Sequence, residues 1–158
     1  MREAYENVKD QVGGCGIWCG SCAVGNGSIR AVTEGLGKVL AAHGLEHWAP
    51  PELDVAALNS GLKTVGDVAA CRGCRQGGGR EDCPLRVCSV ERSQSTCVSC
   101  QKFGSCANDE LLSRMREGAK KAGLFVVDPG VDTEEALVAW RKALPRTWPS
   151  AVLFLEET

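Results

Sequence analysis

The sequence predicts a mainly α-helical protein with a few short strands, a small α+β fold that includes one loop-rich region. Three observations support this fold class. Apolar residues recur at three- and four-residue steps in several segments, which is the period of an amphipathic helix. Two short apolar runs, residues 124–127 and 151–155, have the length of strands. Ten cysteines gather in two stretches, and the second stretch is rich in glycine and has almost no apolar periodicity.

The 158-residue chain is expected to form a single domain, residues 1–158, because 44% of its residues are apolar and can form an ordinary core. Within this domain we expect three parts. They are a cysteine-rich lobe made by residues 15–22 and 71–106, a helical insert over residues 28–60, and a C-terminal helical segment over residues 107–158. The insert therefore separates the two cysteine stretches.

The helical insert is predicted to contain two helices. The first starts at Ser28, a residue that can cap a helix, and carries apolar residues at helical spacing to about residue 42. Gly44 fits its C-terminal end. A second, short helix opens at the Pro50-Pro51 pair and ends at Gly61.

The C-terminal segment is predicted to contain two more helices. Asn108 or Asp109 caps the first, which has two lysines in its last turn and a glycine after it. The second begins at Asp132 or Thr133 and continues to about residue 144. One strand candidate precedes this helix, and the other ends the chain.

The ten cysteines are the candidate metal ligands of this chain. Two thiolates separated by two residues can bind one ion from a tight turn, and a second such pair completes a tetrahedron. The loop-rich stretch has little apolar surface to bury, so we expect metal sites to organise the lobe; structural zinc can contribute on the order of 10 kcal/mol to folding. The candidate ligands are Cys15, Cys19, Cys22, Cys71, Cys74, Cys83, Cys88, Cys97, Cys100 and Cys106.

The use of cysteine and the N-terminus predict a cytoplasmic protein with reduced thiols. Disulfide frameworks are typical of small secreted domains that bury too little apolar surface, whereas this chain can form a core. Residues 1–10 contain no apolar run like that of a signal peptide, and no segment approaches the length of a membrane span. The even number of cysteines also permits five disulfides, which stays the alternative.

The charge balance disfavours a nucleic-acid partner. Eighteen basic and twenty acidic residues give a formal charge of −2, without the basic footprint of a nucleic-acid binder. Residues 71–106 carry a local surplus of basic residues, but Phe103 is their one aromatic residue, so platforms for base stacking are missing. We interpret the basic residues as counterions for metal-bound thiolates.

The first cysteine stretch resembles two catalytic motifs whose surroundings are missing. The segment from Trp18 to Cys22 resembles the thioredoxin redox pair, but that pair requires a preceding strand and a helix that begins at its first cysteine. Here glycines interrupt both neighbouring segments. The spacing of Cys15, Cys19 and Cys22 resembles the cluster motif of radical S-adenosylmethionine enzymes. Those enzymes need a large, strand-rich partial barrel, and this short chain has too few strand candidates to form one.

A third resemblance extends over more than half of the chain. It consists of a CGxxCGxC opening, a helical insert, a CxGC pair, a cysteine-proline-x-arginine segment and a final CxxC that is followed by an aromatic residue and another cysteine. In this chain these elements are residues 15–22, 71–74, 83–88 and 97–106. Together they resemble the family called domain of unknown function 3795, which implies no mechanism. Members often carry a proline where this chain has Ser105 and another cysteine before Cys83, which leaves the second ligand set open.

Zinc is the metal that the sequence favours, because the paired spacing and the small residues inside the turns are typical of closed four-sulfur sites. A 4Fe-4S cluster is the alternative, since it also takes four thiolates. The predicted division puts Cys71, Cys74, Cys97 and Cys100 at one site and Cys83, Cys88 and Cys106 with the first stretch at another.

We expect a binding or interaction module of unknown target, held together by structural zinc. The alternative is a small iron-sulfur protein with a redox or cluster-handling role. Catalysis is disfavoured because the chain has no hydrolase triad order, phosphate loop or dinucleotide motif. His43 and His47 are interpreted as exposed residues at a helix end. A protein partner is left open, as are a monomer and a homodimer, because the C-terminal apolar residues can close the core or form a partner surface. These residues are Trp140, Leu144, Trp148, Leu153 and Phe154.

Overall fold

The computed structural model describes residues 2–155 and is mostly helical, so the predicted fold class is confirmed. In this part of the chain, β structure is limited to two isolated bridges, Val12 with Trp18 and Ile17 with Val126. Within the same residues, no helix is both long and apolar enough to cross a membrane. The α-helices are α1 (Glu3–Val8), α2 (Ser28–Ala42), α3 (Leu45–Trp48), α4 (Val55–Gly66), α5 (Pro84–Glu91), α6 (Asp109–Lys121) and α7 (Thr133–Ala143).

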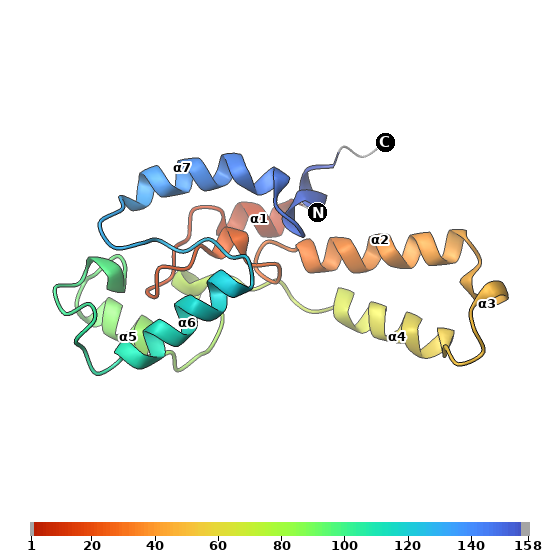
Figure 1. Cartoon of the computed structure of the whole chain (residues 1–158), viewed down its shortest axis with the longest axis horizontal. Helices are drawn as coiled ribbons and strands as arrows, with labels where there is room; N and C mark the ends of the chain where they lie inside the picture. Colours follow the sequence, from red (N-terminus) through yellow and green to blue (C-terminus); the bar gives the residue numbers. More distant parts are fainter. Residues whose placement is uncertain (1, 156–158) are drawn as a thin grey trace.

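The helical insert forms an arm. Helices α2 and α4 pack side by side and extend away from the rest of the molecule, with α3 at the far end (Figure 1). At the base of the arm, the Arg30 side chain donates a 2.8 Å hydrogen bond to the Gly66 carbonyl, so the two ends of the arm lie close together. Ser28, Leu45 and Gly66 are the buried residues between positions 28 and 66.

The second helix of the arm begins and ends about five residues later than the sequence predicted. Helix α4 begins after Asp54, whose carboxylate accepts a 2.9 Å hydrogen bond from the Ala57 amide. It then passes through Gly61, the predicted end, and continues to Gly66. A glycine inside a helix costs only about 1 kcal/mol relative to alanine, so packing against α2 can override it.

The main core lies between α1, α7 and the first cysteine stretch. Trp18 is fully buried there, and its ring is stacked on Trp140 of α7 at a centroid distance of 5.8 Å. Phe125 packs against both rings. The Trp18 indole also donates a 2.8 Å hydrogen bond to the Lys9 carbonyl, which satisfies its one polar atom. The tryptophan that imitates a redox motif is therefore a core residue.

The C-terminal residues close over this core instead of forming a strand. Ser150–Phe154 is a 3₁₀-helix, and the two buried members of the turn, Ser150 and Leu153, are three residues apart. Residues at this spacing share one face of a 3₁₀-helix, which explains why an apolar run of strand length adopts it. Leu144 is also fully buried, whereas Trp148 is 71% exposed.

The cysteine lobe contains a helix that the sequence did not predict. Helix α5 starts with Pro84 at a favourable first position and buries Leu85 and Ser89, which are four residues apart on one face. The other strand candidate, residues 124–127, makes only the single bridge at Val126. A second core cluster, centred on Cys15, Leu85 and Leu112, joins the lobe to α6.

Candidate metal centre

The ten cysteines carry free thiols and divide between two cavities. The larger one, about 260 Å³, is the six-cysteine cavity, and the smaller one, about 100 Å³, is the four-cysteine cavity. The six-cysteine cavity is lined by Cys15, Cys19, Cys22, Cys71, Cys74 and Cys83. The four-cysteine cavity is lined by Cys88, Cys97, Cys100 and Cys106. A third cavity of about 460 Å³ lies at the base of the arm and has no cysteine in its lining.

This division differs from the predicted one. The Cys71 and Cys74 pair lies with the first cysteine stretch, and not with the pair at Cys97 and Cys100. The predicted division also put Cys83, Cys88 and Cys106 at one site, whereas Cys83 lines one cavity and Cys88 and Cys106 line the other. Helix α5 separates Cys83 from Cys88. Cys83 precedes its first turn and Cys88 lies five positions later, about 140° further around a helix with 3.6 residues per turn. The two side chains therefore face different cavities, and Leu85 lines both.

The first cysteine stretch is held by backbone hydrogen bonds. The Trp18 amide donates to the Phe125 carbonyl at 2.9 Å, and the Cys19 amide donates to the Gln11 carbonyl at the same distance. Cys19–Ser21 forms a 3₁₀ turn that ends when the Cys22 amide donates to the Cys19 carbonyl at 3.1 Å. Cys19 and Cys22 are three residues apart, so this turn places them on the same side.

Gln11 fixes the position of the second cysteine pair, and no motif in the sequence pointed to it. Its side-chain amide nitrogen donates to the Arg72 carbonyl at 3.0 Å and to the Asn7 carbonyl at 2.7 Å. Its amide oxygen accepts a hydrogen bond from the Arg75 amide at 3.2 Å. Only 8% of Gln11 is exposed. The turn that carries Cys71 and Cys74 is thus attached to the chain just before the first stretch.

Three glycines of the cavity wall lie close to the side chains around them. A Cβ on Gly73 would lie 2.2 Å from the Gln11 amide oxygen, and a Cβ on Gly78 would lie 2.6 Å from the Cys71 sulfur. A Cβ on Gly13 would lie 3.4 Å from the sulfurs of both Cys15 and Cys74. The sulfurs of Cys15 and Cys74 are therefore at most twice 3.4 Å apart.

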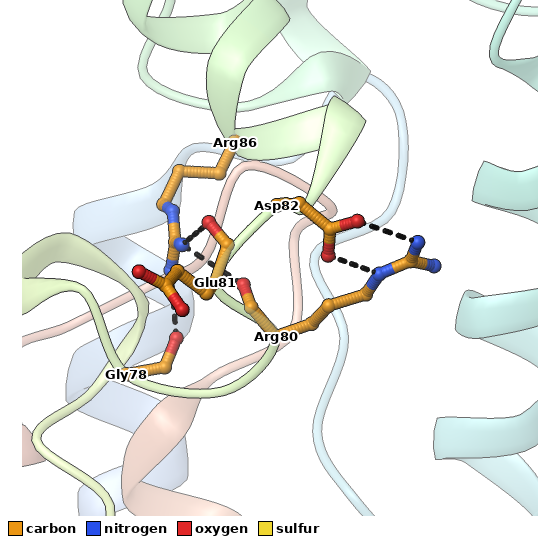
Figure 2. Close-up of polar contacts among 5 residues, drawn as sticks. All are labelled: Gly78, Arg80, Glu81, Asp82 and Arg86. Atoms are coloured by element: carbon orange, nitrogen blue, oxygen red, sulfur yellow. Dashed lines mark hydrogen bonds and ion pairs between the residues drawn. The ribbon is translucent and has the colours of Figure 1, made fainter.

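A glycine-rich loop forms one wall of the six-cysteine cavity, and an arginine of α5 holds it in place. The Arg86 guanidinium donates hydrogen bonds to the carbonyls of Gly78 and Arg80 at 2.7 and 2.8 Å, and a third to Glu81 (Figure 2). Arg80 and Asp82 form a two-point ion pair at the surface. These contacts define the course of the loop that leads to Cys83.

The four-cysteine cavity is built against the first cysteine stretch. The Cys97 amide donates a 2.6 Å hydrogen bond to the Gly14 carbonyl. Cys97–Ser99 is again a 3₁₀ turn, closed by the Cys100 amide on the Cys97 carbonyl at 3.1 Å. Ser99 donates to the carbonyl of the buried Thr96 at 2.9 Å. The turns at the two cavities therefore have the same backbone form.

Burial disfavours the charged form of several thiols. It raises the pKa of Cys19 to about 11, although a 3.5 Å hydrogen bond from the Cys74 amide to the Cys19 sulfur opposes the shift. Burial also raises the pKa of Cys97 to about 11 and raises the pKa of Cys15. Neighbouring cysteines add to each shift, because like charges repel. Near neutral pH these thiols stay protonated unless a cation stabilises the thiolate.

The donor set of both cavities fits a thiophilic metal group. Thiolate ligands select zinc, copper(I) or iron-sulfur clusters over magnesium and calcium. Sulfurs that share one zinc ion lie about 4 Å apart, because each Zn–S bond is about 2.3 Å in a tetrahedron. Within residues 2–155, no three His, Cys, Asp or Glu side chains are already gathered around one point in this way. Loading would therefore require the sulfurs to move closer together.

The two histidines are far from this donor set in the fold. His43 follows the last residue of α2, and its carbonyl accepts a 2.8 Å hydrogen bond from the Trp48 indole. His47 is in α3 at the far end of the arm, 3.5 Å from Glu46. Both side chains belong to exposed residues, as the sequence predicted.

Comparison with known proteins identifies the family. The model of the family described as protein of unknown function DUF3795 matches residues 11–110, which is more than half of the chain. The chain belongs to this family. The match includes all ten cysteines and the whole arm, whereas α7 and the C-terminal 3₁₀-helix lie outside it. Among curated proteins no match was found for this DUF3795 chain. No solved structure matches it either.

Proposed function

We propose that this DUF3795 protein is a metalloprotein in which cysteine thiolates bind structural zinc in both cavities. The observation that carries the proposal is the division of all ten cysteines between two sulfur-lined cavities. Cysteines used only for packing would be scattered through the core. Here all ten line two cavities, and the wall of the six-cysteine cavity also includes Gly73 and Gly78, which have no room for a side chain.

Zinc would act mainly on folding. Most of residues 71–83 are exposed, and the second core cluster buries few large side chains, so the lobe has little hydrophobic stabilisation of its own. Binding of structural zinc by thiolates contributes on the order of 10 kcal/mol, which is enough to order such a segment. Cysteine thiolates of three separate chain segments would then be joined at one centre.

The proposed role of the zinc-stabilised protein is that of a binding or interaction module. Support comes from the arm, which presents exposed apolar side chains on both helices and at its far end. Leu36 and Val39 belong to α2, Trp48 to α3, and Val65 to α4.

An iron-sulfur protein is the second candidate function. One observation favours it: the six-cysteine cavity, at about 260 Å³, is much larger than a single ion requires. The spacing of Cys15, Cys19 and Cys22 also suits a four-iron cluster. Such a centre would support a redox or cluster-handling role, because iron-sulfur clusters exchange electrons and zinc does not.

Metal analysis of the purified protein tests both candidates. The protein is prepared once in air and once under strict exclusion of oxygen, without added metal, and its zinc, iron and acid-labile sulfide are measured. Colourless protein with stoichiometric zinc supports structural zinc. Brown protein with iron and sulfide and no zinc supports the cluster instead. If neither preparation contains bound metal and added zinc or iron does not bind, the metalloprotein proposal is wrong.

A further inference from the structure

We propose that the six-cysteine cavity binds two zinc ions in a thiolate-bridged binuclear cluster, so that the chain carries three zinc ions and not two. This inference rests on the proposed zinc function and adds the stoichiometry and architecture of one centre. The four-cysteine cavity would hold the third ion. The number of ligands, the charge around each cavity and the position of Cys74 support this arrangement.

The number of cysteines in each cavity fits this arrangement. A zinc ion in a structural site takes four thiolates. The four-cysteine cavity supplies that number for one ion. In the six-cysteine cavity, two ions need eight coordination positions, and six thiolates supply them when two of the sulfurs bridge both ions. A single ion would leave two thiols in the same cavity without a metal.

The charged residues around the cavities agree with this assignment. Two zinc ions with six thiolates leave two negative charges, and one zinc ion with four thiolates leaves the same number. The six-cysteine cavity is lined by two basic residues, Arg80 and Arg86, and the four-cysteine cavity by Arg92 and Lys102. Among the lining residues in the described part of the chain, neither cavity has a carboxylate. Asp82 neutralises part of the Arg80 charge at the surface, whereas Arg86 donates to carbonyl oxygens.

Cys74 occupies the position expected of a bridging ligand. Its sulfur shares the space beside Gly13 with the sulfur of Cys15, and both lie 3.4 Å from the point where a Cβ on that glycine would be. Its backbone amide donates a hydrogen bond to the sulfur of Cys19 at 3.5 Å. Cys74 is thus adjacent to two cysteines of the first stretch, and the Gln11 contacts hold its turn in that position.

The stoichiometry and the bridge can be tested on the whole chain. Zinc per chain is counted by native mass spectrometry of protein purified under reducing conditions without chelator. The zinc is then replaced by a spin-active cadmium isotope for NMR. We expect three zinc ions and three cadmium resonances, two of which are coupled to each other through the bridging sulfurs. These two measurements need no variant, so a folding defect cannot obscure them.

Variants assign the ions to the cavities. Cys100→Ser should lose one ion and keep the coupled pair of cadmium resonances. Cys74→Ser should lose the coupled pair and keep the resonance of the four-cysteine cavity. Val87→Ser, at an exposed position on α5 that lines neither cavity, is the control and should keep all three ions.

The possible results separate the inference from the function on which it rests. Two zinc ions with uncoupled cadmium resonances would overturn the binuclear cluster and leave the zinc function intact. Iron and sulfide in the six-cysteine cavity would overturn the inference and favour the second candidate function. Absence of bound metal would overturn both. Three ions with a coupled pair that Cys74→Ser abolishes would establish the proposal.

Discussion

The side chain of Gln11 donates a 3.0 Å hydrogen bond to the carbonyl of Arg72, a residue 61 positions away in the chain. This contact joins the segment before the first cysteine stretch to the turn that carries Cys71 and Cys74. The helical arm lies between the two in sequence, so the contact brings the two ends of a long insertion together. Two of the three hydrogen bonds of this buried amide therefore hold the segment of Cys71 and Cys74 beside the first cysteine stretch, and the third joins the amide to Asn7.

Replacing Gln11 by alanine should destabilise the metal-loaded protein by about 1–3 kcal/mol, the cost of leaving buried polar groups without partners. The carbonyl of Arg72 and the amide of Arg75 would lose their partner. Urea unfolding measures the free-energy change, and the rate of zinc transfer to a chelator should rise with it. Gln76 is exposed and lies in the turn that Gln11 holds, so Gln76→Ala is the matched control and should have little effect. Equal behaviour of the two variants would contradict the role given to Gln11.

Gly73→Ala should be more destabilising than Gly77→Ala. Both glycines have positive φ angles, but Gly77 (ψ 11°) lies in the left-handed helical region, where an alanine costs about 1–2 kcal/mol. Gly73 (φ 88°, ψ 154°) lies in a region that is essentially restricted to glycine, so an alanine there has a larger backbone cost. A Cβ at position 73 would also lie 2.2 Å from the Gln11 amide oxygen, whereas a Cβ at position 77 would meet no atom within 4 Å. Thermal unfolding of the two variants measures the difference in backbone cost together with the clash. The clash should be partly relieved in the Gln11→Ala, Gly73→Ala double variant, and strictly additive effects would argue against it.

Apolar periodicity in the sequence predicted several helices correctly. It did not predict the contacts that determine which cysteines lie together. Helices α2, α6 and α7 have nearly the predicted bounds. Helix α5 was missed because its buried face is Leu85 and Ser89, and a polar serine breaks the apolar pattern. Ser89 packs closely against Gly14, because a Cβ at position 14 would lie only 2.7 Å from the Ser89 hydroxyl oxygen.

The ligand sets could not be derived from spacing for the same reason. Without α5, nothing in the sequence separates Cys83 from Cys88. Without the Gln11 contacts, the CxxC spacing alone does not say which pair lies beside which. Long-range hydrogen bonds carry this information, and a single sequence does not display them.

Arg116→Met should destabilise the protein, although methionine retains much of the apolar volume. Arg116 is only 7% exposed, and its guanidinium donates to the carbonyls of Cys15 and Val127 at 3.1 and 2.8 Å. Loss of these charged hydrogen bonds leaves buried carbonyls unpaired, at a cost of about 1–3 kcal/mol. Chemical denaturation measures the change. Arg114→Met, exposed on the same helix, is the control; if it cost as much as Arg116→Met, the buried contacts would not be the cause.

Removal of metal should unfold the cysteine lobe before the main core. The lobe relies on the proposed thiolate centres, whereas α7 packs on Tyr5, Val127 and Leu144 through apolar contacts that need no metal. Hydrogen exchange followed by mass spectrometry, with and without chelator, resolves the two regions. We expect faster exchange over residues 71–106 and retained protection in α7. Simultaneous loss of protection in both regions would mean that the centres and the core form one cooperative unit.

Excision of the arm should leave metal binding intact. The arm packs mainly on itself, and the hydrogen bond from Arg30 to the Gly66 carbonyl shows that its two ends are neighbours. A short glycine-serine linker in place of residues 34–65 can therefore join them at a small entropic cost, because closing a short loop between adjacent ends requires little ordering. Metal content per chain, measured by elemental analysis, should equal that of the full chain.

The excised variant also tests the interaction role proposed for the arm. If the excised variant no longer binds a partner that the full chain binds, and its metal content is unchanged, then the arm is responsible for binding and the lobe for metal-dependent folding. A control that keeps the arm and replaces only Trp48 by serine removes the largest exposed apolar side chain at its far end. If excision instead released the metal, the arm would be part of the metal-binding fold. The contact between Arg30 and Gly66 would then be part of what holds the two cysteine stretches in place, because the relative position of these stretches would depend on the arm.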